Sequence, residues 1–270
     1  MAISADALQV YEGMPILTGA ASQEEQERLE HRPLGFVPIT HTFSVGEFVP
    51  LAHKEIDDAL KNGRTPIVVG GTGLYLRAAL SELDLKPPPP PDLRAWLEAE
   101  ADEAGVEALH ARLAQRAPGV AAKVAPADRS RVIRLLELLE MGHLEDEEPR
   151  VESQLWTEDT RHPTLLAGLT MDRAELYERI DRRVDRMVGA GVLEEVKAAH
   201  DAGASVTARK ALGFQELLVG DIDAMKTRSR QYARRQLTWM RKLPNVELID
   251  VTGRDPGDVA EQIVQSAASP

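Results

Sequence analysis

Apolar and polar positions in the first part of the chain follow the order of an α/β unit. Ile67-Val68-Val69 is a short β-branched run that leads into Gly70-Gly71-Thr72-Gly73 and an apolar segment from Leu74. A buried strand, a glycine turn and a helix account for this order. Upstream, Ser44-Val-Gly-Glu47 has the spacing of a capping box, and the apolar residues after it recur at helical spacing. The pattern predicts a parallel sheet with helices.

A run of prolines from Pro87 to Pro91 interrupts this pattern. Such a run is stiff and extended, so it indicates a boundary. The segments after it have helical periodicity, and Asp128 is placed to cap one of them. Apolar strand-like runs return at Thr164–Leu169 and Val246–Val251. The sequence therefore predicts an α/β core of residues 1–90 and 166–270, with a helical insertion domain of residues 91–165.

Charge is distributed unevenly along the chain. The net charge of −12 argues against nucleic-acid binding over the whole surface, but not against a local basic patch. The stretch from Lys226 to Lys242 holds seven basic residues and no acidic one, with Tyr232 and Trp239 between the arginines. Phosphate contact and base stacking use this mixture. The alternative is a solvated basic helix face.

Several classes of site are excluded by composition. The chain has no cysteine, so it has no disulfide framework, thiolate zinc site or cysteine nucleophile, and a reducing cytoplasm is the expected compartment. No apolar run approaches the roughly 20 residues that span a bilayer, so no membrane partner is expected. The seven histidines lack metal-ligand spacing, and we assign no side chains to a metal site.

Three further segments are candidates for chemistry, each with a structural alternative. Asp6 follows a short apolar run, where α/β sheets place reactive groups, although a helix cap also explains it. The glycines around Thr72 would let backbone approach a ligand, yet a tight turn needs them too. The segment Arg209–Glu216 is basic and contains a glycine, which a turn alone explains.

Taken in order, these segments resemble the tRNA dimethylallyltransferase family, also called tRNA isopentenyltransferases. The resemblance runs from residue 3 to about residue 242. The most specific part of the resemblance is GGTGLYLR followed by RRQLTWMR. The segments that carry the resemblance are ISADALQVY, FSVGEF, VVGGTGLYLRAAL, ADRSRVIRLLELLEMG, LYERIDRRVDRMVGAGVLEEV, KALGFQEL and YARRQLTWMRK. The resemblance implies an α/β fold with a P-loop NTPase-like parallel sheet core and a helical insertion domain.

The family transfers a dimethylallyl group from dimethylallyl diphosphate to N6 of the adenosine 3′-adjacent to the anticodon. The resemblance implies that Asp6 is the catalytic carboxylate, which accepts the proton of that weakly nucleophilic amine. The departing diphosphate needs donors and Mg²⁺ to receive its charge. The adenine must also leave its stack to enter a protein pocket. The implied partners are the tRNA anticodon stem-loop and dimethylallyl diphosphate, bound by a monomer.

The resemblance also assigns residues that contact tRNA. They lie on the loop after Asp6, beside the glycine turn, next to the insertion and in two later segments. These residues are Ala7, Leu8, Gln9, Thr72, Arg129, Ser130, Arg131, Val132, Ile133, Lys210, Gly213, Phe214, Gln215, Arg234, Arg235, Gln236, Thr238, Trp239 and Arg241.

The sequence departs from the family pattern before Ile3. Family members open with a strand and a Gly-x-x-x-x-Gly-Lys-Ser/Thr loop, whereas this sequence starts at Met1-Ala2. We therefore expect the first strand and the P-loop to be missing, and we assign no diphosphate-binding residues. The main interpretation is an enzyme of this family whose N-terminal strand and P-loop are missing from this sequence. A non-catalytic tRNA-binding relative and an adenylate-directed isopentenyltransferase are the alternatives, and the insertion argues against the second of these.

Overall fold

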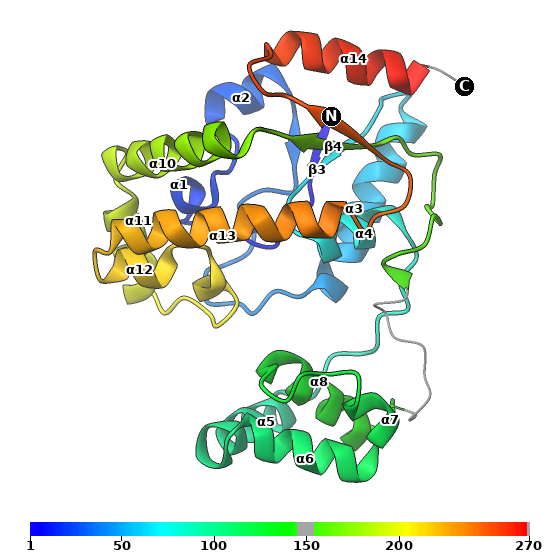
Figure 1. Ribbon diagram of the computed structural model, residues 1–270, viewed down its shortest axis with the longest axis vertical. Helices are drawn as coiled ribbons and strands as arrows, with labels where there is room; N and C mark the ends of the chain where they lie inside the picture. Colours follow the sequence, from blue (N-terminus) through cyan, green and yellow to red (C-terminus); the bar gives the residue numbers. More distant parts are fainter. Residues whose placement is uncertain (145–153, 269–270) are drawn as a thin grey trace. The chain divides into compact units, whose positions relative to one another are not determined.

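The computed structural model describes residues 1–144 and 154–268 (Figure 1). The chain divides into two compact units, one of residues 1–82 and 155–270 and the other of residues 83–154. The first is an α/β unit and the second is helical where it is described. Within the described residues, no helix is long and apolar enough to cross a membrane.

The strands of the α/β unit pair in parallel, as the sequence predicts. Strand β1 (Ala2–Ser4) lies between β2 (His31–Arg32) and β3 (Ile67–Val69), in the order β2-β1-β3. Strands β4 (Leu166–Thr170) and β5 (Val246–Asp250) form a second parallel pair. Parallel strands require crossover connections, and helices supply them here. The α/β class with a parallel sheet is therefore confirmed.

Side chains cap the starts of several helices of this unit. The Ser44 hydroxyl accepts a hydrogen bond from the Glu47 amide, and the Glu47 carboxylate accepts one from the Ser44 amide, which confirms the predicted capping box. Helices α10 (Arg173–Gly189) and α13 (Ile222–Met240) lie side by side, as do α11 (Val192–Asp201) and α12 (Phe214–Leu218) (Figure 1). The helices are α1 (Pro15–Thr18), α2 (Gln23–Arg28), α3 (Val45–Lys61), α4 (Gly73–Leu80), α10 (Arg173–Gly189), α11 (Val192–Asp201), α12 (Phe214–Leu218), α13 (Ile222–Met240) and α14 (Pro256–Ala268), with a 3₁₀ turn η1 at Ala208–Lys210.

One hydrophobic core holds β1, α3, α4 and the helices α10 to α13 together. Ile3 of β1, Phe48 of α3 and Phe214 of α12 are fully buried in it. Each contributes roughly 2–3 kcal/mol of transfer free energy through burial of its side chain. The loop after β1, which carries Asp6, therefore begins at a strand that is anchored in this core.

The helical unit consists of α5 (Pro91–Ala104), α6 (Val106–Arg116), α7 (Pro118–Ala121) and α8 (Arg129–Glu140). The Asp128 side chain accepts a hydrogen bond from the Arg131 amide and caps α8, as predicted. Leucines from α5, α6 and α8 form a separate core. Glu137 is also buried there, and the guanidinium groups of Arg94 and Arg134 neutralise its carboxylate.

The division into units differs from the domain boundaries that the composition suggests. The predicted insertion of residues 91–165 includes residues 145–153, which lie outside the described part. Residues 155–162 belong to the α/β unit because buried Arg77 binds them: its Nη2 donates to the carbonyl oxygens of Thr157 at 3.0 Å and Asp159 at 3.1 Å. A buried arginine contact of this kind leaves no mark in composition.

Candidate active site

Asp6 lies on the turn that follows β1. The Ala5 amide donates to the Val69 carbonyl oxygen at 2.8 Å, so the loop leaves the sheet beside β3. The Asp6 Oδ1 atom accepts hydrogen bonds from the Leu8 amide at 2.8 Å and the Gln9 amide at 3.4 Å. Asp6 therefore caps a turn of its own loop, and no helix starts there. Its second oxygen, Oδ2, accepts no hydrogen bond from the residues that the structure describes.

The surroundings of Asp6 suit a proton acceptor. Burial raises the pKa of its carboxyl above the usual range, while the amides of Leu8 and Gln9 and the Arg183 guanidinium lower it. A carboxylate with a raised pKa is a stronger base than an exposed aspartate. The sequence does not single out Arg183, because it is one of several arginines in α10 and its approach to Asp6 depends on tertiary structure.

Gly19 makes room for Arg183. It ends α1 with φ +61°, and a Cβ atom there would lie 2.2 Å from the Arg183 Nη2 atom. Glu195 of α11 fixes the other end of α1, since its carboxylate accepts hydrogen bonds from the amides of Ile16 at 3.0 Å and Leu17 at 2.7 Å. Glu195 of α11 therefore fixes the start of α1, and Arg183 lies against Gly19 at its end.

Gln9 anchors the Asp6 loop from within. Its Oε1 atom accepts a hydrogen bond from the Ser4 hydroxyl at 2.7 Å, and its Nε2 atom donates to the Gly19 carbonyl oxygen at 3.1 Å. Ala7 and Leu8 are half-buried and pack on the core. The side chain of Gln9 thus orients the loop, which is a role that the sequence prediction of tRNA contact did not include.

The glycine turn before α4 fits between the Asp6 loop and α13. A Cβ atom on Gly70 would lie 2.5 Å from the Ala5 carbonyl oxygen, so only glycine allows this approach. On the other side, the Gly71 carbonyl oxygen accepts hydrogen bonds from the Tyr232 hydroxyl at 3.1 Å and Gln236 Nε2 at 3.2 Å. Thr72 is half-exposed, and its hydroxyl makes no capping bond to α4. The structure therefore brings together three of the predicted segments.

Helix α13 separates its paired cations from its unpaired ones. Ion pairs neutralise the basic residues of its first half: Lys226 with Asp185, Arg228 with Glu216, and Arg230 with Asp181. The predicted tRNA contacts Arg234, Arg235 and Arg241 are exposed and form no ion pair with another described residue. Thr238 is exposed between them, and Trp239 is half-buried. The free positive charge of α13 is thus concentrated at the end where it meets the glycine turn.

The predicted segment around α12 is partly internal. Lys210 and Gln215 are exposed. Phe214 is fully buried, and Gly213 has φ +94° and lies against Met225. These two residues therefore have structural roles in the turn between η1 and α12. Only the exposed members of this segment present side chains to solvent.

The predicted residues in α8 belong to the helical unit. Ser130 and Arg131 are exposed. Val132 and Ile133 are buried in the helical core. The Arg129 guanidinium forms ion pairs with Glu98 at 2.6 Å and Asp102 at 2.8 Å. These contacts give Arg129, Val132 and Ile133 structural roles within α5 and α8.

Sequence comparisons identify a family for most of the chain. Residues 9–243 match the family model described as IPP transferase. A tRNA dimethylallyltransferase of Thermobifida fusca (strain YX) is 38% identical over 97% of this chain and 84% of its own length. Another tRNA dimethylallyltransferase, of Halalkalibacterium halodurans, is 38% identical over 94% of this chain and 83% of its own length.

Solved structures give the same result. The full-length tRNA isopentenylpyrophosphate transferase of Bacillus halodurans superimposes with a TM-score of 0.69 at 35% identity, over 99% of this chain and 86% of that one. A eukaryotic dimethylallyltransferase acting on tRNA superimposes with a TM-score of 0.74 at 26% identity, over 98% of this chain and 70% of that one. Both alignments run through the α/β unit and the helical unit.

Proposed function

Because the chain belongs to the IPP transferase family, we propose that it is a tRNA dimethylallyltransferase, a prenyltransferase that uses dimethylallyl diphosphate. We propose further that the acceptor is N6 of the adenosine 3′-adjacent to the anticodon. The observation that supports this best is the Asp6 carboxylate. It lies on a fixed loop, its pKa is raised by burial, and Arg183 supplies a positive charge near it.

The proposed reaction needs a base and an acceptor of negative charge. The exocyclic amine attacks the first carbon of the dimethylallyl group, the new N–C bond forms, and the C–O bond to diphosphate breaks with its electron pair on oxygen. Asp6 takes the proton that the amine loses. We propose that the Arg183 guanidinium, which lies near enough to Asp6 to lower its pKa, also stabilises the charge that develops on the diphosphate. Asp6 is held by hydrogen bonds within its own loop, and Arg183 belongs to helix α10.

Magnesium is expected to enter with the substrate. Among the described residues, no three His, Cys, Asp or Glu side chains are grouped to hold a metal ion. Mg²⁺ is commonly bound through substrate phosphates, water and one or two carboxylates. Magnesium bound in this way would neutralise part of the negative charge on the departing diphosphate.

The RNA would bind where free positive charge meets the Asp6 loop. Arg234, Arg235 and Arg241 supply cations for phosphates, and the half-exposed Thr72 lies on the turn that α13 contacts. The anticodon stem-loop is the partner that this surface would take. All the proposed contacts come from one chain, so we infer that the protein acts as a monomer. Because its substrate would be tRNA, we infer that it acts in the cytoplasm.

The test is prenyl transfer from labelled dimethylallyl diphosphate to an anticodon stem-loop. We expect transfer by a form of the protein that includes the P-loop, and in that form at least about a tenfold loss of turnover in Asp6→Ala with nearly unchanged RNA affinity, because a general base typically contributes a factor of 10² or more. Asp255→Ala is the matched control, since Asp255 also caps a turn through an amide, that of Gly257, at the start of α14. It should leave turnover unchanged.

Other outcomes separate the remaining possibilities. RNA binding without transfer, by this chain and also by a form that includes the P-loop, would identify a non-catalytic tRNA-binding relative. Transfer to free adenylate in place of the stem-loop would identify an adenylate-directed enzyme. An unchanged rate in Asp6→Ala would contradict the role of Asp6 as the base, even if the activity itself were present.

A further inference from the structure

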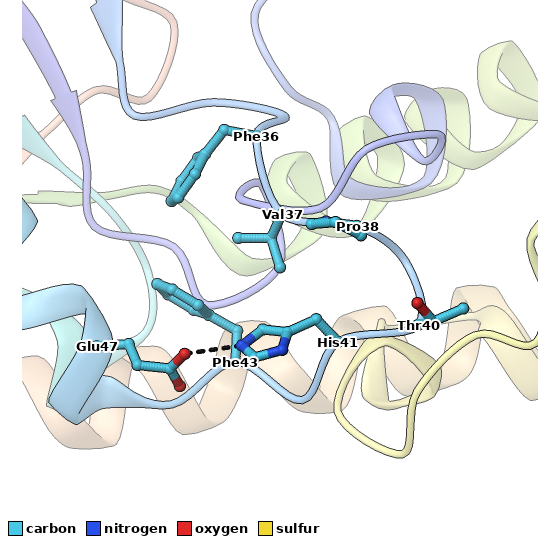
Figure 2. Close-up of a pocket in the computed structure, with 7 residues that line it drawn as sticks. All are labelled: Phe36, Val37, Pro38, Thr40, His41, Phe43 and Glu47. Carbon is cyan, nitrogen blue, oxygen red and sulfur yellow. Dashed lines mark hydrogen bonds and ion pairs between the residues drawn. The ribbon is translucent and has the colours of Figure 1, made fainter.

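A surface hollow of about 560 Å³ lies in the segment between β2 and α3. Its apolar wall consists of Phe36, Val37, Pro38 and Phe43, and Figure 2 shows the two phenylalanine rings near Val37 on one side of the loop. The rings meet edge to face, with centroids 5.8 Å apart. Phe43 is buried, whereas Phe36 remains 40% exposed. Phe36 therefore offers aromatic surface to solvent beside a buried ring.

Polar groups form the rest of the hollow. His41 and Glu47 join through a hydrogen bond of 2.7 Å between the imidazole Nε2 and the carboxylate Oε1 (Figure 2). Thr40 adds a hydroxyl. An apolar wall with a few hydrogen-bonding groups at its edge is typical of a site for a flat, heteroaromatic ligand.

The hollow is tied to the Asp6 loop by backbone hydrogen bonds. The Gln9 carbonyl oxygen accepts one from the Gly35 amide, and the Val10 carbonyl oxygen accepts one from the Phe36 amide, each at 2.9 Å. The Tyr11 hydroxyl accepts a third from the Phe43 amide at 3.1 Å. Phe36 is therefore held directly against the loop that carries the proposed base.

Its other end is tied to the segment before α12. The Ser205 amide donates to the Ile39 carbonyl oxygen at 2.9 Å. Thr40 lies close to Gly203, with its methyl group 3.9 Å from the position of a Cβ atom there. This segment continues into η1, where Lys210 is exposed. The hollow is therefore continuous with two segments of the proposed RNA surface.

We propose that this hollow binds an unpaired base of the RNA substrate, next to the base that reacts, by stacking it on Phe36. The proposal rests on the proposed function, because it adds a second base site to the same RNA surface. The hollow has room for a nucleobase, the ring of Phe36 offers aromatic surface, and Thr40 and His41 offer groups for the base edge. Lys210, five residues after Ser205 on the segment that binds Ile39, supplies positive charge for the RNA backbone.

The test compares Phe36→Ala with Phe36→Trp and with Leu60→Ala. Leu60 is a matched control, because it is also an exposed apolar residue, at 41%, on α3 of the same unit. The probe is an anticodon stem-loop RNA, and the measurements are its Kd over a range of salt concentrations and the thermal unfolding midpoint of each variant. We expect Phe36→Ala to bind about tenfold more weakly, as loss of one stacked base predicts. Phe36→Trp and Leu60→Ala should bind like the wild type.

The salt dependence distinguishes stacking from a loss of charge. Stacking releases no counterions, so Phe36→Ala should keep the wild-type slope of log K against log salt. A stem-loop with an abasic site at the stacked position should bind the wild type and Phe36→Ala equally. Equal Kd values for wild type and Phe36→Ala on the intact RNA would overturn the base site while leaving the proposed function standing. A wild-type chain that binds no stem-loop would overturn both.

Discussion

The indole ring of Trp239 lies directly against Gly73, so that a Cβ atom on Gly73 would be 2.2 Å from its Cε2 atom. The contact joins α13 to the first residue of α4. The same indole also packs on Trp156, with ring centroids 5.1 Å apart. Trp239 therefore fixes the position of α13 against the glycine turn, in addition to the RNA contact that the sequence assigns to it.

Replacement of Gly73 by alanine should destabilise the protein and weaken RNA binding. The indole is a rigid ring attached to a residue of α13, so it cannot move aside as the end of a flexible side chain could. Overpacking of this kind costs about 1–3 kcal/mol. Urea unfolding and stem-loop affinity measure the two effects. Gly189→Ala is the control, because a Cβ atom there meets nothing within 4 Å, and its stability should be unchanged or slightly higher.

Replacement of Asp6 by asparagine should stabilise the fold at neutral pH. The side-chain amide in Asp6→Asn would keep an oxygen for the Leu8 and Gln9 amides but would carry no charge to desolvate. In the wild type the pKa of Asp6 is raised by burial above 3.8, so the unfolded chain releases this proton first as pH rises. Wild-type stability therefore falls relative to Asp6→Asn from about pH 3.8 upward, until the folded carboxyl has also ionised. Urea unfolding as a function of pH would show a gap that opens in this window. A gap that stays constant with pH would contradict the raised pKa.

Removal of the Arg183 charge should move the pH dependence of activity. The guanidinium lowers the pKa of Asp6, so Arg183→Gln should raise that pKa and shift the acid limb of kcat/KM to higher pH. Arg182→Gln is the control on the same helix, since Arg182 is exposed and does not contribute to the pKa of Asp6. A pH profile with an unmoved acid limb in Arg183→Gln would show that this charge does not act on the base.

Local sequence patterns predict the elements of this fold well where capping residues and turn residues mark the ends of the elements. Ser44 with Glu47 gives the start of α3, and Asp128 gives the start of α8. The glycine turn after Val69 is predicted for the same reason, since its residues determine the backbone directly. These features depend on residues within a few positions of one another.

Features that depend on distant residues are not predictable in this way. Arg183 is 177 positions from Asp6, and nothing in α10 separates it from the other arginines of that helix. The ion pairs of Arg228 and Arg230 likewise come from α12 and α10, so the basic stretch reads as uniform in sequence but is half neutralised in the fold. The burial of Phe214 is also decided by tertiary packing.

Buried Arg77 should control the stability of residues 155–162. Arg77 is 2% exposed, its guanidinium donates to the carbonyl oxygens of Thr157 and Asp159, and desolvation lowers its pKa. Arg77→Ala would leave a cavity and unpaired carbonyl groups, at a cost of about 2–5 kcal/mol. Limited proteolysis should then cut near residue 157. Arg64→Ala is the control, because Arg64 pairs with Glu30 at the surface and contributes less than about 1 kcal/mol.

The division of α13 into paired and unpaired cations predicts two different salt dependences. Arg234→Ala with Arg235→Ala removes two exposed cations, so stem-loop binding should weaken and its slope of log K against log salt should fall by about 1.5, at roughly 0.7–0.9 for each lost phosphate contact. Arg228→Ala with Arg230→Ala removes the same formal charge from the same helix, but these cations already pair with Glu216 and Asp181. The slope of this second variant should stay close to that of the wild type. Equal changes in both variants would mean that RNA responds to the total charge of α13, and the unpaired end would then not be the binding surface.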